Sequence, residues 1–136
     1  MICRAEDYIA LLESDDVYEP SPYDEATEEV WLDIVARFPQ AHRAVSHNKT
    51  TPEAVIRALF SIGDEIVRSQ LACVRRTPPD LLVEMASDPS SMVGAALTCH
   101  PKLPPEALAK LLLHASEFVR ERANDRVRRD AASTNE

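Results

Sequence analysis

The sequence predicts an all-α fold in which helical repeats stack into a solenoid behind an acidic, helical N-terminal cap. Two observations favour this class: a proline-containing phrase occurs three times, and apolar residues follow each copy at the spacing of a helix buried on one side. In addition, two glycines in 136 residues leave little material for β-hairpins or phosphate-binding loops. The three copies of the phrase are residues 50–53 (TTPE), 77–80 (TPPD) and 103–106 (LPPE).

The spacing of these copies predicts the repeat length. When Pro52, Pro79 and Pro105 are aligned, the steps are 27 and 26 residues. Periods of this size are typical of stacked supersecondary units that cannot bury their apolar faces alone. We therefore expect about 26 residues per repeat, with the extra residue of the first copy beside Gly63.

The cap is expected to span residues 1–44 and to include a degenerate first repeat. Apolar residues at helical spacing predict a first helix over residues 5–13 and a second helix whose buried side includes Trp31 and Ile34. Between them, residues 17–23 (VYEPSPY) read as a stiff loop that carries two tyrosines.

Three repeats follow over residues 45–124. In each, proline suits the first turn of a longer helix, and Thr51 is a candidate cap for the first of them. A shorter helix of about two turns, α or 3₁₀ in character, comes next, and the last one is expected to end near Asn124. Residues 125–136 are expected to form a polar C-terminal tail, and the whole chain, 1–136, is expected to be one domain.

The third copy resembles a known family. Residues 92–112 contain a small-residue run, then H-P-x-x-P-P-E and a leucine-rich helix, and this pattern is similar to the leucine-rich repeat variant family. The resemblance covers about residues 45–124. It implies a HEAT- or armadillo-like, right-handed superhelix of alternating α and 3₁₀ helices, and a binding surface rather than catalytic residues.

Cysteine and histidine are expected to be structural. In the alignment above, Cys73 and Cys99 share a column with Ser46, and His47 shares one with His100. Equivalent positions of stacked helices are about 8–10 Å apart, too far for a disulfide or a common metal ion. We therefore expect small buried cysteines and no cofactor, and a metal or iron–sulfur protein is the third alternative.

Enzymatic motifs are not evident. Phosphate-binding loops, a G-x-S-x-G elbow and an H-E-x-x-H helix are all missing from the sequence. His42, with Arg43 and Ser46 nearby, is the nearest approach to a catalytic cluster, but we expect His42 to be a surface or interface residue on a short helix. The sequence therefore predicts a protein that is not an enzyme.

The start of the chain lacks the apolar core of a signal peptide, and no run approaches the length of a membrane span. We expect a cytoplasmic protein without membrane contact, with reduced cysteines.

Charge is the feature that separates this chain from a plain solenoid. Residues 1–33 contain eleven acids and one base, a net charge of −10, whereas the remainder carries +2. Acids beside tyrosines are typical of a surface that attracts a basic partner, although a merely solubilising cap would also be acidic. Direct nucleic-acid binding is disfavoured, because the five arginines from Arg120 to Arg129 are mixed with the four acids of residues 117–130 and are expected to lie on a solvated face. The predicted partner-binding residues are Asp15, Asp16, Tyr18, Glu19, Tyr23, Asp24, Glu25, Glu28, Glu29 and Asp33.

Small size and acidity favour, as the most specific hypothesis, an inhibitor or immunity-type protein that covers the basic surface of a toxin such as a nuclease. A general scaffold or assembly subunit, binding through the solenoid surface, is the alternative.

Overall fold

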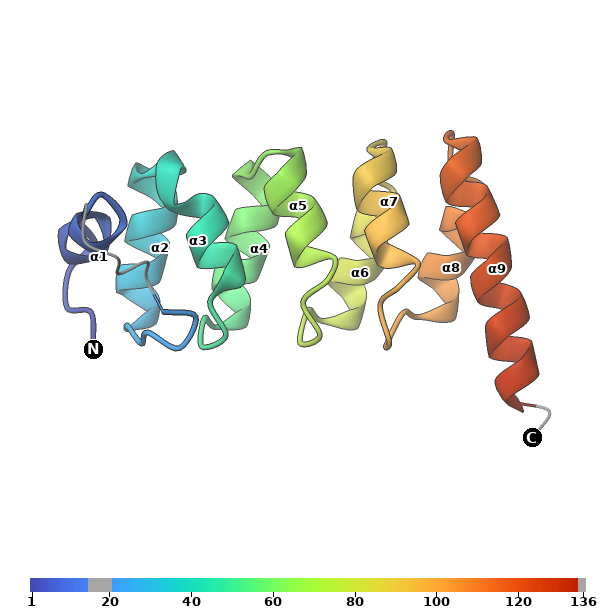
Figure 1. The fold of residues 1–136 in the computed structure, drawn as a ribbon, viewed down its shortest axis with the longest axis horizontal. Coiled ribbons are helices and arrows are strands. Elements are labelled where there is room, and N and C mark those ends of the chain that lie inside the picture. The colour runs from blue at the N-terminus through green and yellow to red at the C-terminus, as the bar shows by residue number, and fades with distance from the viewer. Residues whose placement is uncertain (15–20, 135–136) are drawn as a thin grey trace. The chain divides into compact units, whose positions relative to one another are not determined.

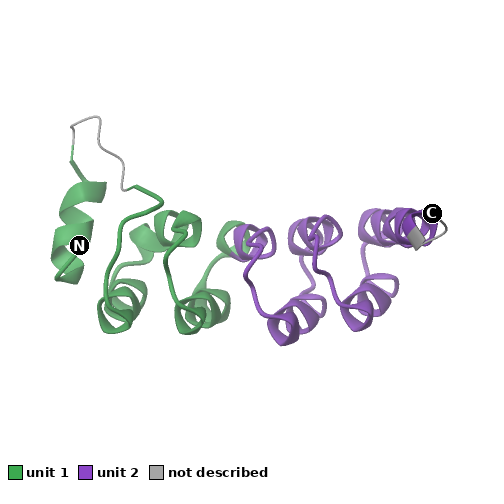
Figure 2. Cartoon of the chain, turned by 90° about the horizontal axis from the view of Figure 1, so that it is seen from below, with its two compact units in different colours: residues 1–67 green, residues 68–136 purple. Residues whose placement is uncertain are grey.

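The computed structural model describes residues 1–14 and 21–134 and confirms the all-α class. In this part of the chain the regular structure consists of α-helices and one 3₁₀ turn (Figure 1). An isolated parallel bridge pairs Ile2 with Ala26. The chain divides into two compact units, residues 1–67 and 68–136 (Figure 2). The single-domain organisation stays a prediction.

Unit 1 is organised around helix α2. This helix packs against α1 on one side and against α3 and α4 on another. Trp31, Ile34 and Val35 of its apolar face are buried, as the sequence pattern predicts, whereas Val30, which the pattern places on the same side, is partly exposed. The elements are α1 (Ala5–Leu12), α2 (Glu28–Arg37), the 3₁₀ turn η1 (Pro39–Ala41), α3 (His42–His47), α4 (Glu53–Ile62) and the start of α5 (Glu65–Leu71).

Unit 2 continues from α5 with four further helices. Helix α6 packs against α7 and α8, and α9 packs against α7 and α8. Leu82, Met85, Leu97 and Leu111 are inaccessible to solvent in this core. The helices are α6 (Pro79–Met85), α7 (Ser91–Leu97), α8 (Pro105–Leu111) and α9 (Glu117–Thr134).

The helix starts correct the expected alignment by one residue. Pro52, Pro78 and Pro104 are the N-cap residues of α4, α6 and α8, so Pro52 corresponds to Pro78 and not to Pro79. Thr51 therefore precedes the cap instead of forming it. The ambiguity arises because a proline pair offers two candidates, and the second proline of each pair begins the helix at N1. In the corrected alignment no extra residue beside Gly63 is needed.

The corrected alignment also changes the columns. The buried small residues are Ser46, Ala72 and Thr98. Cys73 and Cys99 come one residue later, in the turns that follow α5 and α7, and both are exposed. The expectation of buried core cysteines was wrong, because each cysteine lies one residue beyond the buried position, in a turn outside the helix.

The two histidines of the expected column have different environments. His47 is exposed, whereas His100 is 1% exposed. His100 Nε2 lies 2.9 Å from the Val74 carbonyl oxygen, and its Nδ1 accepts a hydrogen bond from the Lys102 N–H at 3.0 Å. Because a carbonyl can only accept, Nε2 carries the proton. His100 thus joins two turns of unit 2.

The last helix is longer than predicted. Helix α9 has 18 residues and continues to Thr134, so much of the expected tail is helical. Arg126 explains the extension, since its guanidinium donates to the carbonyl oxygens of Thr98 at 3.0 Å and His100 at 2.7 Å and pairs with Asp130 at 3.0 Å. Its side chain is 12% exposed. The arginines of this segment are therefore not all on a solvated face.

Gly94 allows α9 to approach α7. A Cβ atom at this position would lie 2.9 Å and 3.0 Å from the two methyl carbons of Val119, closer than packed carbons tolerate.

We predict that Gly94→Ala lowers the free energy of unfolding by about 1–3 kcal/mol, although alanine is the better helix former. Val119→Ala, which removes the two methyl groups, should relieve the clash. Urea unfolding of both single variants and the double variant measures the coupling. If the two losses simply add, the contact between α7 and α9 is not what requires glycine.

Candidate protein-binding surface

The segment 21–27, which carries several predicted partner-binding residues, is held in place by backbone hydrogen bonds. The Ile2 N–H donates to the Glu25 carbonyl at 2.7 Å, and the Lys49 N–H donates to the Pro22 carbonyl at 2.6 Å. The Asp24 carbonyl accepts from Asn48 Nδ2 and from Thr50 Oγ1, both at 2.8 Å. A loop tied on both sides presents its side chains with little ordering cost on binding.

Tyr23 and Asp24 lie at the centre of this loop and differ in exposure. Tyr23 is 65% exposed, and the Lys49 ammonium lies 5.4 Å from the centre of its ring. The Asp24 carboxylate accepts from the Ser21 N–H at 2.9 Å. Asp24 thus shapes the loop, and Tyr23 is the side chain that a partner can reach.

Three exposed carboxylates follow at the start of α2. Thr27 caps this helix by accepting from the Val30 N–H at 3.3 Å, and Glu28 and Glu29 occupy its first turn. Negative charge is favourable there because it faces the positive end of the helix dipole. Glu25, Glu28 and Glu29 have no ion-pair partner among residues 1–14 and 21–134.

Asp33, further along α2, is part of a charge cluster. Its carboxylate accepts from Arg37 at 2.8 Å and 3.0 Å, and Arg37 also donates to Glu6 of α1 at 2.5 Å. The hydrogen bond from Arg37 holds the pKa of Glu6 below its ordinary value. Since these side chains are about half exposed, the cluster contributes little to stability. Because Arg37 pairs with Asp33, this carboxylate offers a partner less negative charge than Glu25, Glu28 or Glu29 does.

Four of the predicted residues, Asp15, Asp16, Tyr18 and Glu19, lie outside the described residues. The exposed side chains that remain are those of Tyr23, Glu25, Glu28 and Glu29, and we call these four residues the acidic surface.

An aromatic pair packs in the core of the same unit. Tyr8 of α1 meets Trp31 of α2 edge-on, with ring centres 5.4 Å apart and planes at 75°. Both side chains are at most 1% exposed. Burial, assisted by the negative charge of Asp24, raises the pKa of Tyr8 to about 12.

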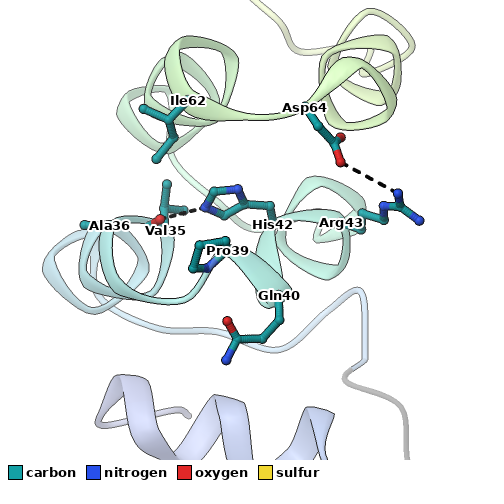
Figure 3. Close-up of a pocket in the computed structure, with 8 residues that line it drawn as sticks. All are labelled: Val35, Ala36, Pro39, Gln40, His42, Arg43, Ile62 and Asp64. Atoms are coloured by element: carbon teal, nitrogen blue, oxygen red, sulfur yellow. Dashed lines mark hydrogen bonds and ion pairs between the residues drawn. The ribbon is translucent and has the colours of Figure 1, made fainter.

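Within the described residues, no hydrogen bond joins the side chains of the expected catalytic cluster, His42, Arg43 and Ser46, to one another. Ser46 Oγ donates to the Arg43 backbone carbonyl at 2.6 Å. His42 is 7% exposed, so it does not lie at the surface of its short helix. Its Nε2 lies 2.7 Å from the Val35 carbonyl oxygen, beside a cavity in unit 1 (Figure 3). The sequence could not show this cavity, because it is formed by residues from α2, η1, α3 and the end of α4.

Metal ligands do not converge in the described residues: no group of three or more His, Cys, Asp or Glu side chains there could hold an ion. None of the helices in residues 1–14 and 21–134 is long and apolar enough to cross a membrane.

Comparison with known proteins yields no relative: no protein-family model, no curated protein and no solved structure matches the chain. The resemblance to the leucine-rich repeat variant family thus has only the sequence in its support.

The buried Tyr8 predicts a loss of stability at high pH. The unfolded chain releases the tyrosine proton near pH 10, whereas the folded chain holds it until about pH 12. Folding stability should therefore be complete below pH 10 and fall as the pH rises towards 12.

Chemical unfolding at several pH values between 9 and 12 measures this slope. Tyr8→Phe should reduce the slope without adding a charge, and Tyr23→Phe, at an exposed position, is the matched control. Equal slopes in all three proteins would contradict the assignment to Tyr8.

Proposed function

We propose that this chain is a non-enzymatic, all-α helical-repeat protein that binds a basic protein through the acidic surface of unit 1. In its most specific form, the proposal is an inhibitor or immunity-type protein that covers the basic surface of a toxin such as a nuclease. The proposal includes a right-handed solenoid with about 26 residues per repeat, similar to the leucine-rich repeat variant family, and a cytoplasmic location with its three cysteines as free thiols.

One observation carries the proposal: an exposed aromatic ring and three carboxylates without ion-pair partners lie on a loop and helix start that backbone hydrogen bonds hold in place. Tyr23 offers contact area at a low entropy cost. Glu25, Glu28 and Glu29 offer negative charge that no described base neutralises. Interfaces combine such groups, with aromatic residues in the centre and charges at the rim.

The charge distribution favours a basic partner. Exposed carboxylates raise the rate of encounter with a positive surface and contribute less to the lifetime of the complex. The net charge of −10 over residues 1–33 adds to this field over longer distances at low salt.

A specific observation also favours the scaffold alternative, in which the helices of the second unit bind the partner. Met92 on α7 and Phe118 on α9 are 46% and 52% exposed, and they are the second residues of helices that pack together. Exposed apolar residues at equivalent positions are typical of repeat proteins that bind along one face.

Charge-neutral variants separate these two proposals. The bait is the full chain, used to capture partners from its source cells, and the test variant combines Glu25→Gln, Glu28→Gln and Glu29→Gln. We expect association with the captured partner to slow roughly tenfold at low salt and the salt dependence to weaken. Tyr23→Ala should speed dissociation, at a cost of about 1–2 kcal/mol.

The matched control removes three exposed acids from unit 2 with Glu84→Gln, Glu106→Gln and Glu121→Gln. It changes the net charge equally and should affect binding less. If the control slows association as much as the test variant, net charge and not the acidic surface attracts the partner. If Met92→Ser and Phe118→Ser abolish binding and the unit 1 variants do not, the scaffold proposal replaces the first.

A further inference from the structure

Unit 1 contains a cavity of about 520 Å³ whose volume is in the usual range for small-ligand sites. It is lined by apolar groups on one side and by polar groups from α3 and the turn before α5 on the other (Figure 3). Among the residues that line the cavity are Ala36, Pro39, His42, Arg43, Ile62 and Asp64.

The imidazole of His42 is the fixed polar group of this cavity. The Val35 carbonyl, 2.7 Å away, can only accept, so Nε2 of the neutral ring is the donor. Nδ1 is then an acceptor. It has no hydrogen-bond partner in the described part of the chain, and Figure 3 shows this nitrogen on the side of the ring away from Val35, towards Ile62 and Asp64. Nδ1 of His100 and His114, by contrast, accepts from a backbone N–H.

Asp64 is a second fixed acceptor. Its Oδ1 accepts from the Val67 N–H at 2.9 Å, which positions the carboxylate at the start of α5. This hydrogen bond, together with the nearby positive charge of Arg43, holds the pKa of Asp64 below its ordinary value. The carboxylate therefore stays ionised at neutral pH.

Arg43 also lines the cavity, and its side chain is held only by a weak ion pair. Its Nη2 lies 3.7 Å from Asp64 Oδ2, beyond the distance of a good hydrogen bond, and both side chains are about 60% exposed. Pairs of this kind are worth little and exchange readily with solvent. A ligand with N–H donors can therefore replace Arg43 at Asp64, because the arginine side chain is long and free to move into water.

We propose that this cavity binds an alkylammonium or alkylguanidinium group, whose head donates to His42 Nδ1 and Asp64 and whose alkyl chain packs on Pro39, Ala36 and Ile62. Such a group is the end of a lysine or arginine side chain, or a free aliphatic amine. The proposal does not rest on the proposed function, since the cavity residues are different from those of the acidic surface.

The test uses the full chain and the probes n-butylammonium, propylguanidinium and butyrate. Titration with either cation should move the Nδ1 resonance of His42 in a long-range ¹H–¹⁵N spectrum, in the direction expected when a ring nitrogen accepts a hydrogen bond. The Nδ1 resonances of His100 and His114 should not move, because their acceptor sites are occupied. Butyrate should produce no such change.

Variants assign the contacts. Asp64→Asn keeps an oxygen that can cap α5 but removes the charge, and it should weaken cation binding about three- to tenfold. Glu28→Gln removes one charge from the acidic surface of the same unit and should leave binding unchanged. Arg43→Ala should bind the cations at least as tightly as the wild-type chain, because it removes the competing donor.

His42→Gln supplies an amide N–H for Val35 but no acceptor at the Nδ1 position, and it should lose binding while keeping its helical circular dichroism. If the His42→Gln variant does not fold, the binding measured with Asp64→Asn and Arg43→Ala tests the proposal instead. Loss of binding in Arg43→Ala, or a response to butyrate in place of the cations, would overturn the proposal. So would unchanged binding in Asp64→Asn.

The source of the group can be distinguished with Nα-acetyl-lysine methylamide. Tighter binding of this compound than of n-butylammonium identifies a protein side chain as the ligand, whereas the reverse order identifies a free amine. If the cations bind to the wild-type chain but the captured partner does not depend on Asp64, the cavity site stands apart from the protein-binding surface. If the partner depends on the acidic surface and no cation binds, only the cavity proposal fails.

Discussion

Much of the structure depends on side chains that satisfy the backbone carbonyls of turns 26 residues earlier in the chain. Buried or partly buried carbonyls need a donor, and short helices leave their last carbonyls unpaired. Here the donor repeatedly lies 26 residues after the acceptor: Thr50 on Asp24, His100 on Val74, His114 on Asp88 and Arg126 on His100. The side chains differ, yet each of these bonds joins successive turns within one of the two units.

This constraint explains why histidine, a residue that invites a catalytic or metal-binding interpretation, is structural at most of its buried positions. The imidazoles of His100 and His114 are used twice, once as donor to a carbonyl and once as acceptor from a backbone N–H two residues later. His42 satisfies a carbonyl in the same way, but its second nitrogen has no such partner. Because only one ring nitrogen of His42 has a partner in the described residues, a ligand can form a hydrogen bond with the other.

Helix positions and the buried faces could be predicted well from the sequence, because apolar periodicity and proline are strong local signals. Trp31, Ile34, Leu82 and Met85 are buried as the pattern indicates. The register could not be predicted, since a proline pair leaves a one-residue ambiguity and only the N-caps resolve it. That single residue decided whether Cys73 and Cys99 point inwards. The extent of α9 was also missed, because its anchor is a contact between Arg126 and carbonyls far away in the sequence.

The sequence predicts which residue types make up the candidate site, but it does not predict how their side chains are paired. An excess of acids near tyrosines identifies the segment, but it does not separate Glu28 and Glu29, which are unpaired, from Asp33, which Arg37 engages. Nor does it show that Asp24 serves the loop through its carbonyl and carboxylate. The ion pair with Arg37 creates the first distinction. Contacts with Ser21 and with residues 48–50 create the second, and residues 48–50 belong to a distant segment that has no local sequence signal.

The bonds between side chains and carbonyls 26 residues apart have a consequence for how such a chain can change length. Deleting or inserting a single residue between donor and acceptor would shift one of them along its turn and leave a carbonyl without a hydrogen-bond donor. Adding or removing a complete 26-residue segment would instead place a new donor opposite each old acceptor. When the chain grows by duplication of whole segments, each carbonyl keeps a hydrogen-bond donor. When it grows by single residues, the first insertion already leaves a carbonyl without one.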